Sequence, residues 1–286
     1  MIFQIKGWWM KNRLGVMQGR LSEPSPGKIQ EFPTHHWDSE FPTLKQIGIH
    51  LLEWTLDWKD IAKNPIMNEQ EIPRILELIT LNDVAVSSAT LDCFMQFPCW
   101  SKEFDDSSFR QYEILLENSK ILGAKYLVLP LVDNSSINES YKFESLFDFC
   151  KEITPLLSNA EVKILFESDY SALELFDFIS KFDSTYFGIN YDIGNSASLG
   201  FNPEDEIKNY GDWIKNVHVK DRLIGSSTVP LGEGAADFDK VFNSLANIDY
   251  SGNFILQTAR SSTGDHVEVI EKYRDVTLEW MDRYGF

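Results

Sequence analysis

The chain has 286 residues, of which 43% are hydrophobic and 24% are charged, so it can bury a sizeable core and is not expected to be disordered. Lys and Arg number 26 against 44 Asp and Glu, and the resulting net charge of −18 repels phosphate backbones, so no nucleic-acid partner is expected. The three cysteines lack a C-x-x-C pair, which argues against a disulfide framework and against a thiolate zinc site.

The beginning of the chain does not read as a secretion signal, because Gln4 and Lys6 interrupt its apolar run. No stretch elsewhere approaches about 18 consecutive apolar residues, so no membrane partner is expected. The first strand-like pattern begins at Arg13. We therefore predict a cytoplasmic protein in which residues 1–12 are an N-terminal appendage and residues 13–286 form a single domain.

Eight short β-rich runs alternate with longer amphipathic stretches from Arg13 onward. The runs are residues 14–19, 51–56, 84–90, 126–131, 162–168, 187–192, 214–221 and 253–258. Several are continuously apolar, which is typical of parallel strands buried on both faces. Eight alternating units predict an α/β fold, a closed (β/α)8 TIM barrel. A doubly wound open sheet is the rival architecture, but no G-x-G-x-x-G follows the first run.

Two of the intervening stretches carry specific helix patterns. Asn202 followed by Pro203 predicts a helix N-terminus, with an N-cap residue and then proline in the first helical position. Near the end of the chain, Val269, Tyr273, Val276 and Trp280 recur at helical spacing and predict one buried helix face.

Polar residues close four consecutive runs, at Glu167, Asp192, His218 and Gln257. In a barrel of this type the active site lies at the C-terminal ends of the strands, so these side chains are expected to converge at one mouth. Carboxylate and imidazole ligands suit Mn, Mg, Co or Zn, and we predict one divalent metal ion. The alternative is that each residue is an isolated polar cap on its strand.

Several segments resemble the second half of the xylose isomerase-like TIM barrel superfamily, the sugar phosphate isomerase/epimerase group. They are ILFES, NYDIGN, NVHVKD, VPLGEGAADF and ILQTAR, and the early segments LGVMQGRL and EFPTLKQIGIHLLEW are similar to the group's first βα unit. The resemblance places the family's metal ligands on Glu167, Asp192, His218 and Gln257. The last is a glutamate in the epimerases, and although an amide can still ligate a cation, it cannot take a proton from carbon.

Other polar residues follow the strands at positions where a substrate would bind. Lys220 and Glu53 are candidate catalytic residues, although Lys220 could instead support His218 and Glu53 could pair with a nearby base. The candidate substrate-binding residues are Gln18, Arg20, Asn195, Arg222, Glu233 and Arg260. Arginine and lysine after strands one, seven and eight favour an anionic substrate, to which Gly225 and Gly232 to Gly234 would add backbone donors. For the arginines, surface pairing is the competing interpretation.

The resemblance implies a metal-dependent sugar or sugar-phosphate isomerase or epimerase that acts through an enediolate, with Glu167 as metal ligand and acid/base. With Gln257 in place of a glutamate, either Glu53 or Lys220 supplies the second proton, or the reaction uses one face of the carbon. A dehydratase of the same superfamily and a non-catalytic sugar-binding barrel remain alternatives. An endonuclease is disfavoured, because the chain has only five histidines and a charge of −18. Whether the chain forms a homo-oligomer is left open.

Overall fold

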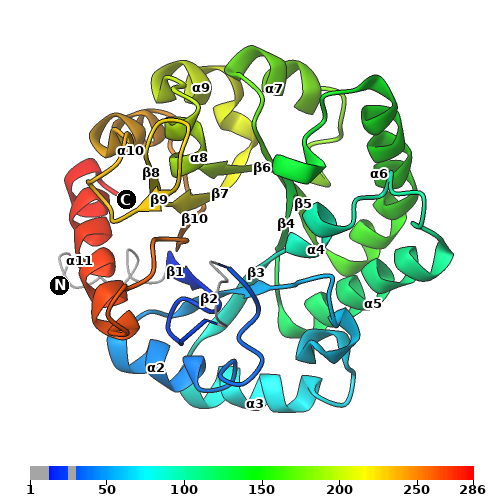
Figure 1. The fold of residues 1–286 in the computed structure, drawn as a ribbon, viewed down its shortest axis with the longest axis horizontal. Coiled ribbons are helices and arrows are strands. Elements are labelled where there is room, and N and C mark those ends of the chain that lie inside the picture. Colours follow the sequence, from blue (N-terminus) through cyan, green and yellow to red (C-terminus); the bar gives the residue numbers. More distant parts are fainter. Residues whose placement is uncertain (1–12, 25–29) are drawn as a thin grey trace.

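Eight parallel strands close into a ring, with helices packed around the outside (Figure 1). This computed structural model describes residues 13–24 and 30–286. The strands are β1 (Leu14–Met17), β2 (Leu51–Thr55), β3 (Ala85–Thr90), β4 (Tyr126–Leu131), β5 (Lys163–Ser168), β6 (Phe187–Asp192), β7 (Ile214–Val219) and β10 (Asn253–Leu256), in the order β1-β10-β7-β6-β5-β4-β3-β2. Each of the eight predicted runs contains one of them. The (β/α)8 prediction is therefore confirmed, and the open-sheet alternative is wrong.

The helices cover the outer face of the strands, as the amphipathic stretches of the sequence require. They are α2 (Glu40–Ile47), α3 (Ile72–Asn82), α4 (Asp92–Gln96), α5 (Asp106–Leu122), α6 (Ser140–Ala160), α7 (Ala172–Ile179), α8 (Ile193–Ser198), α9 (Pro203–Tyr210), α10 (Phe238–Asn247) and α11 (His266–Tyr284). Short 3₁₀ turns lie at Ile61–Lys63, Pro65–Met67, Asp133–Ser135 and Gly211–Trp213. As predicted, α9 begins after an Asn202 cap, whose side chain accepts the backbone N–H of Glu204.

The buried face of α11 lies one residue away from the predicted one. Ile270, Thr277 and Met281 are buried, whereas Val276, which was expected to be inside, is 37% exposed. Tyr273 and Trp280 are half-buried against the core. The apolar stripe of this helix is wider than four residues, so the pattern located the stripe but not its centre.

Strand register brings the ends of the strands to a common level. Asp192 at the end of β6 pairs with His218 on β7, and His218 in turn pairs with Ile255 on β10. Because parallel strands in a barrel point the same way, their C-terminal ends form one rim. The apolar core lies between this ring and the helices and contains Trp54 and Phe94, both fully buried. Both aromatic side chains therefore pack in the core.

One small element was not predicted from the sequence. After β7 the chain forms an antiparallel hairpin of β8 (Asp221–Arg222) and β9 (Thr228–Val229) beside α8.

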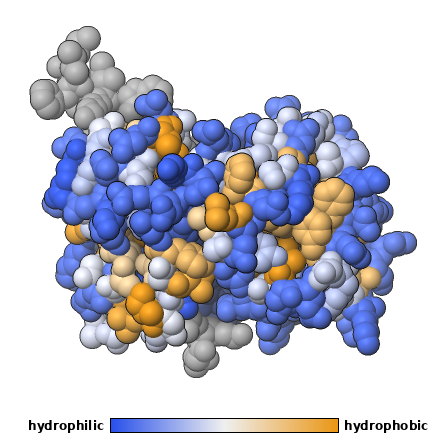
Figure 2. All heavy atoms as spheres, turned by 90° about the horizontal axis from the view of Figure 1, so that it is seen from above, coloured by the Kyte–Doolittle hydropathy of each residue, from blue (hydrophilic) through white to orange (hydrophobic). Residues whose placement is uncertain are grey.

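Within residues 13–24 and 30–286, no helix has the length and apolar character needed to cross a membrane. Hydrophilic side chains cover most of the face drawn in Figure 2, and its apolar side chains form separate groups. The predicted appendage, residues 1–12, lies outside the described residues.

Candidate active site

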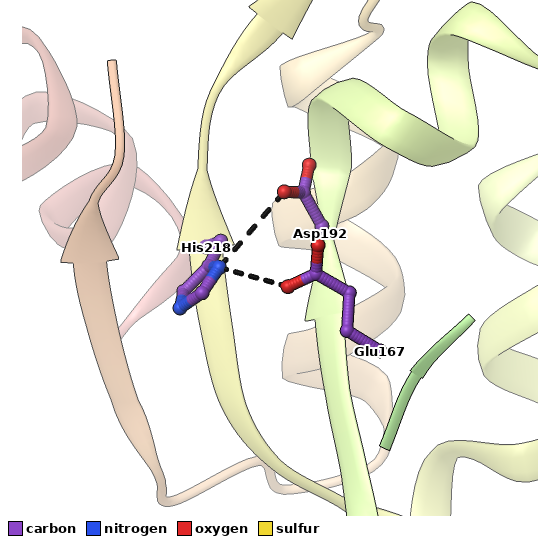
Figure 3. A group of neighbouring side chains, drawn as sticks. All are labelled: Glu167, Asp192 and His218. Carbon is purple, nitrogen blue, oxygen red and sulfur yellow. Dashed lines mark ion pairs between the residues drawn. The ribbon is translucent and has the colours of Figure 1, made fainter. Parts of the chain in front are cut away.

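Three residues from consecutive strands converge at the C-terminal rim of the barrel. Glu167 on β5, Asp192 on β6 and His218 on β7 each offer one ligand atom, and these atoms lie within 4.8 Å of one another. Figure 3 shows both carboxylates directed at the same imidazole nitrogen. That nitrogen, Nδ1, lies 3.1 Å from Glu167 Oε2 and 3.9 Å from Asp192 Oδ2. All three side chains are buried.

The imidazole of His218 is held from below by Glu53. His218 Nε2 lies 2.7 Å from Glu53 Oε1, and Ser88 and Thr90 donate their hydroxyls to the same carboxylate at 2.7 and 3.0 Å. In the neutral form of the ring, which metal binding requires, a carboxylate at Nε2 favours the tautomer that carries its proton there and leaves the Nδ1 lone pair directed at Glu167 and Asp192. This arrangement is common for metal-binding histidines.

Within the described residues His218 Nδ1 is a buried polar atom without an assigned hydrogen bond, and Glu167 Oε2 lies 3.1 Å from it. Burial alone would lower the pKa of His218, but the carboxylates of Glu53 and Glu167 outweigh it and raise the pKa to about 10. The cluster therefore attracts positive charge. An unsatisfied nitrogen next to two carboxylate oxygens fits a divalent cation.

Glu167 is fixed by two asparagine side chains. Asn190 Nδ2 donates to Oε2 at 2.7 Å and Asn195 Nδ2 donates to Oε1 at 2.8 Å. Burial favours the protonated form of Glu167, but His218 and Lys220 outweigh burial and hold the pKa below its usual value. Asp192 accepts the backbone N–H of Asn195 at 2.8 Å, because it is also the N-cap of α8. Asn195 thus connects both carboxylates.

Lys220 lies between Asp192 and Gln257. Its Nζ donates to Asp192 Oδ2 at 2.8 Å and to Gln257 Oε1 at 3.0 Å. Gly194 in α8 allows this path, because a Cβ added there would lie 2.7 Å from Lys220 Cγ. The Gln257 oxygen therefore faces an ammonium group, and its predicted role as a metal ligand stays a prediction.

A cavity of about 660 Å³ opens above these residues at the rim. Glu167, Asn195, Lys220, Arg222 and Gln257 line it, and Gln30, Thr90, Asp92, Asp133 and Asp169 contribute further polar groups. This volume lies in the range of small-molecule sites. Four carboxylates and two cations face the space, so a positive ion would balance its charge.

A protein-family model described as the xylose isomerase-like TIM barrel matches residues 41–284. The chain belongs to this family. An L-ribulose-5-phosphate 3-epimerase from Escherichia coli O1:K1 / APEC is 24% identical over 263 residues, which cover 87% of this chain and 91% of that protein.

Solved structures of other xylose isomerase-like barrels share the fold. The IOLI protein with a binding zinc atom has a TM-score of 0.73 at 17% identity, over 95% of this chain and 99% of that chain. A xylose isomerase-like TIM barrel protein from Mycobacterium smegmatis, in complex with magnesium, has a TM-score of 0.70 at 13% identity, over 94% and 97%. At these identities the likeness supports the barrel architecture alone.

Several predicted site residues lie outside the cavity lining, and three of them are held by contacts inside the barrel or with the loop after β1. Glu53 is fully buried beneath His218, because its position within β2 directs it into the barrel interior. Gln18 is also fully buried, and its Oε1 accepts the backbone N–H of Thr55 at 3.3 Å. Arg20 is buried and donates to Gln30 Oε1 at 2.8 Å. Glu53 thus contacts His218 and Arg20 contacts Gln30, and the predicted catalytic and substrate-binding roles of the three residues stay predictions.

Arg260 and Glu233 also lie outside the cavity lining. Arg260 Nη1 donates to the carbonyl oxygen of Ser22 at 2.8 Å, so its guanidinium supports the loop after β1. Glu233 is exposed on the loop before α10 and is outside the cavity lining. The sequence located both residues on loops at the rim, but it did not determine the direction of their side chains.

The backbone donors expected to bind phosphate are already used. Asp221 Oδ2 accepts the N–H groups of Gly232 and Gly234, each at 2.9 Å, and Oδ1 accepts that of Ala236 at 3.1 Å. Position 234 requires glycine, because an added Cβ would lie 2.1 Å from Asp221 Oδ1. The prediction that these glycines donate to a substrate is therefore corrected, and Gly225, which lines the cavity, donates its N–H to the Ser198 carbonyl oxygen at 2.8 Å.

Sequence reasoning missed several residues that organise the site. Asn216 donates to Asn190 Oδ1 at 2.9 Å and thereby fixes the amide that holds Glu167. Asn190 and Asn216 each precede a predicted ligand by two residues, so period-two alternation places them on the same face of their strands, and this signal was available. Gln30 and Asp92 were also missed, because they lie beyond the strand ends.

Proposed function

We propose that this chain is a divalent-metal-dependent isomerase or epimerase of a sugar or sugar phosphate. The observation that carries the proposal is the convergence of Glu167, Asp192 and His218 beside an open cavity. The naming of curated relatives as L-ribulose-5-phosphate 3-epimerases supports the same reaction class. A cytoplasmic location agrees with this function and stays a prediction.

Glu167, Asp192 and His218 are the proposed metal ligands. Two carboxylates and one neutral imidazole suit Mn, Mg, Co or Zn, and their two negative charges neutralise a divalent ion. When bound, such an ion supplies Lewis acidity toward a carbonyl oxygen. Three protein ligands leave coordination positions for substrate oxygens.

Glu167 is the proposed acid/base residue. Its carboxylate lines the cavity, and the two asparagine donors fix both of its oxygens. Removal of a proton from the carbon beside a carbonyl leaves an enediolate, whose negative charge requires a nearby positive group. Lys220 Nζ is the protein cation beside Asp192, and it is the residue we assign to stabilise this charge.

Lys220 and Arg222 are the proposed contacts for an anionic substrate. Both line the cavity, and Arg222 Nη1 donates to Asn195 Oδ1 at 2.8 Å. Arg20 and Arg260 are not included in this set, because they lie outside the cavity lining and donate to Gln30 and to the Ser22 carbonyl oxygen. A sugar phosphate therefore remains the preferred substrate class, with two cations in place of four.

Deuterium exchange tests the proposed function. The purified protein is analysed for metal and then incubated in D2O with ketoses and ketose phosphates, including L-ribulose 5-phosphate and D-tagatose. We expect deuterium at the carbon next to the carbonyl, loss of exchange after chelation and recovery with Mn²⁺. Glu167→Gln should reduce exchange by about 10²–10⁴-fold, as expected for loss of a general base, while the exposed Glu144→Gln should not.

Other outcomes would point to the alternative functions. An enone or dicarbonyl product would identify a dehydratase. Ligand binding to the metal-loaded protein without exchange on any tested sugar would contradict the proposal and favour a sugar-binding barrel.

A further inference from the structure

The cavity contains a buried carboxyl group that the proposed function has not used. Asp92 follows β3 and lines the cavity together with Glu167 and Gln257, yet it is only 4% exposed. Glu167 lies near the end of β5 and Gln257 follows β10, and these strands and β3 occupy different parts of the ring, so the three residues border the space from different sides. An amide at position 257 cannot carry a proton, so a two-base reaction needs another carboxyl group.

We propose that Asp92 is the second acid/base residue of the reaction, acting on the face of the carbon opposite to Glu167. The inference rests on the proposed function. Glu167 takes the proton, and the C–H electron pair forms the double bond of the enediolate. Asp92, as a carboxylic acid, gives its proton to the same carbon from the other face. The double-bond electrons form the new C–H bond, and the carbonyl is restored.

This step balances without a further reactant. It ends with Glu167 protonated and Asp92 ionised. Glu167 then loses its proton to water and Asp92 gains one from water, which restores the starting protonation states. In the reverse direction the two residues exchange their roles.

The contacts of Asp92 leave one of its oxygens available to a substrate. Gln30 Nε2 donates to Asp92 Oδ2, whereas no donor in residues 13–24 or 30–286 is hydrogen-bonded to Oδ1. Gln30 Oε1 in turn accepts from Arg20 Nη2 at 2.8 Å, which fixes the orientation of this amide. Asp92 is therefore held in place by an amide on one side and faces the cavity on the other.

The same amide connects Asp92 to the position that lacks a carboxylate. Gln257 Nε2 lies 3.5 Å from Gln30 Oε1, so a single side chain separates Gln257 from Asp92. The two residues therefore approach the cavity from either side of Gln30. We assign to Asp92 the proton transfer that an amide at position 257 cannot perform.

The electrostatic surroundings favour a proton on Asp92 near neutral pH. Burial raises the pKa to about 7, and the negative charges of Asp57 and Glu167 act in the same direction. The Gln30 hydrogen bond and the Arg20 guanidinium oppose this shift. The neighbouring Cys93 on the same helix is a buried thiol, and burial raises its pKa as well, so it adds no negative charge at this pH. Such a carboxyl group suits proton transfer in either direction.

The test compares Asp92→Asn with wild type on the ketose that exchanges in the D2O screen. Asparagine can still accept from Gln30, so the variant removes only the capacity to carry a proton. We expect the rate of epimerisation to fall by about 100-fold or more. The second readout is the loss of deuterium to H2O from a substrate that is labelled at the reacting carbon and has the configuration that Glu167 deprotonates. Its rate should stay within about tenfold of the wild-type rate. Asp148→Asn, an exposed change on α6, should alter neither rate.

Metal content and thermal stability of Asp92→Asn are measured in parallel, and both should match wild type. Asp92→Glu retains a carboxyl group and should epimerise at least about tenfold faster than Asp92→Asn. Exchange without epimerisation in wild type, wild-type epimerisation by Asp92→Asn, or equal loss of exchange and epimerisation would each overturn the assignment. Absence of exchange in wild type would instead overturn the proposed function.

Discussion

The charged residues on two sides of the barrel rim differ in what their side chains contact. On the β5 to β7 side, Glu167, Asp192 and His218 direct their polar atoms at one another, and Glu167 also lines the cavity. On the side of the loops after β1 and β10, Arg20 and Arg260 direct theirs at an amide and a backbone carbonyl. The first group lies on the strands and the second on the loops that follow them, and both were predicted to contact ligand.

The difference lies in how each side chain is positioned. For a residue on a strand, the pleat sets the direction of the side chain and the strand register sets its position along the barrel axis. Its side chain can therefore be placed from the sequence. A loop residue has no such constraint, and the nearest backbone group that needs a donor can capture it. Charged residues on strand ends are therefore stronger predictions of a site than charged residues on the following loops.

The largest expected effect concerns the support of the strand-end cluster. Glu53→Gln replaces the carboxylate that faces His218 Nε2, so we expect metal affinity to fall by about 10–100-fold. Competition with a chelating dye measures this change. Glu233→Gln makes the same chemical change on an exposed loop and should leave affinity unaltered. Equal affinities for both variants would mean that Glu53 does not orient a ligand.

A matched pair of arginine variants tests the two sides directly. Arg222→Met should raise KM about tenfold or more for a ketose phosphate, but not for the unphosphorylated ketose, because a charged hydrogen bond contributes about 1.5–3 kcal/mol. Arg260→Met should leave both KM values within about twofold and lower Tm, because the Ser22 carbonyl loses its donor. A rise in KM for Arg260→Met would show that the loop side also binds substrate.

The smallest expected effect is the pH dependence of the loop after β1. Glu40 is buried, and burial raises its pKa from 4.5 to about 7, although the N–H of Gly19 and the hydroxyl of Ser22 oppose the shift. The folded protein thus holds this proton more tightly than the unfolded chain. Its contribution to stability is present below pH 4.5 and is lost as pH rises to about 7.

Glu40→Gln removes this titration while one oxygen can still accept from Gly19 and Ser22. The Tm of the variant minus the Tm of wild type should therefore be larger at pH 8 than at pH 5. The exposed Glu144→Gln should give the same difference at both pH values. A constant difference for Glu40→Gln would show that Glu40 is ionised throughout the range.

The barrel and the core of its candidate site could be predicted from the sequence, because both depend on strands. Continuous apolar runs identified the eight strands, and their polar last residues identified Glu167, Asp192 and His218. Glu53 was chosen correctly as a residue near the site, but its place in the middle of β2 puts it below His218. The sequence does not reveal depth along a short strand.

Residues beyond the strand ends could not be placed in the same way. Asp92 comes two residues after the end of β3, where α4 begins, and Gln30 belongs to the long connection after β1. Their contact joins positions 62 residues apart, and no local pattern encodes it. The β8 and β9 hairpin was missed for a related reason, because each of its strands has only two residues.

The three N–H groups gathered around Asp221 have a consequence for ligand design. A phosphate-bearing inhibitor aimed at this backbone would compete with a carboxylate that the chain itself supplies, at an effective concentration that a free ligand does not reach. Compounds selective for this barrel should instead place their anionic group near the side chains of Lys220 and Arg222. A compound that binds Asp221→Ala more tightly than wild type would be using the backbone donors. Such a compound would bind the natural protein poorly.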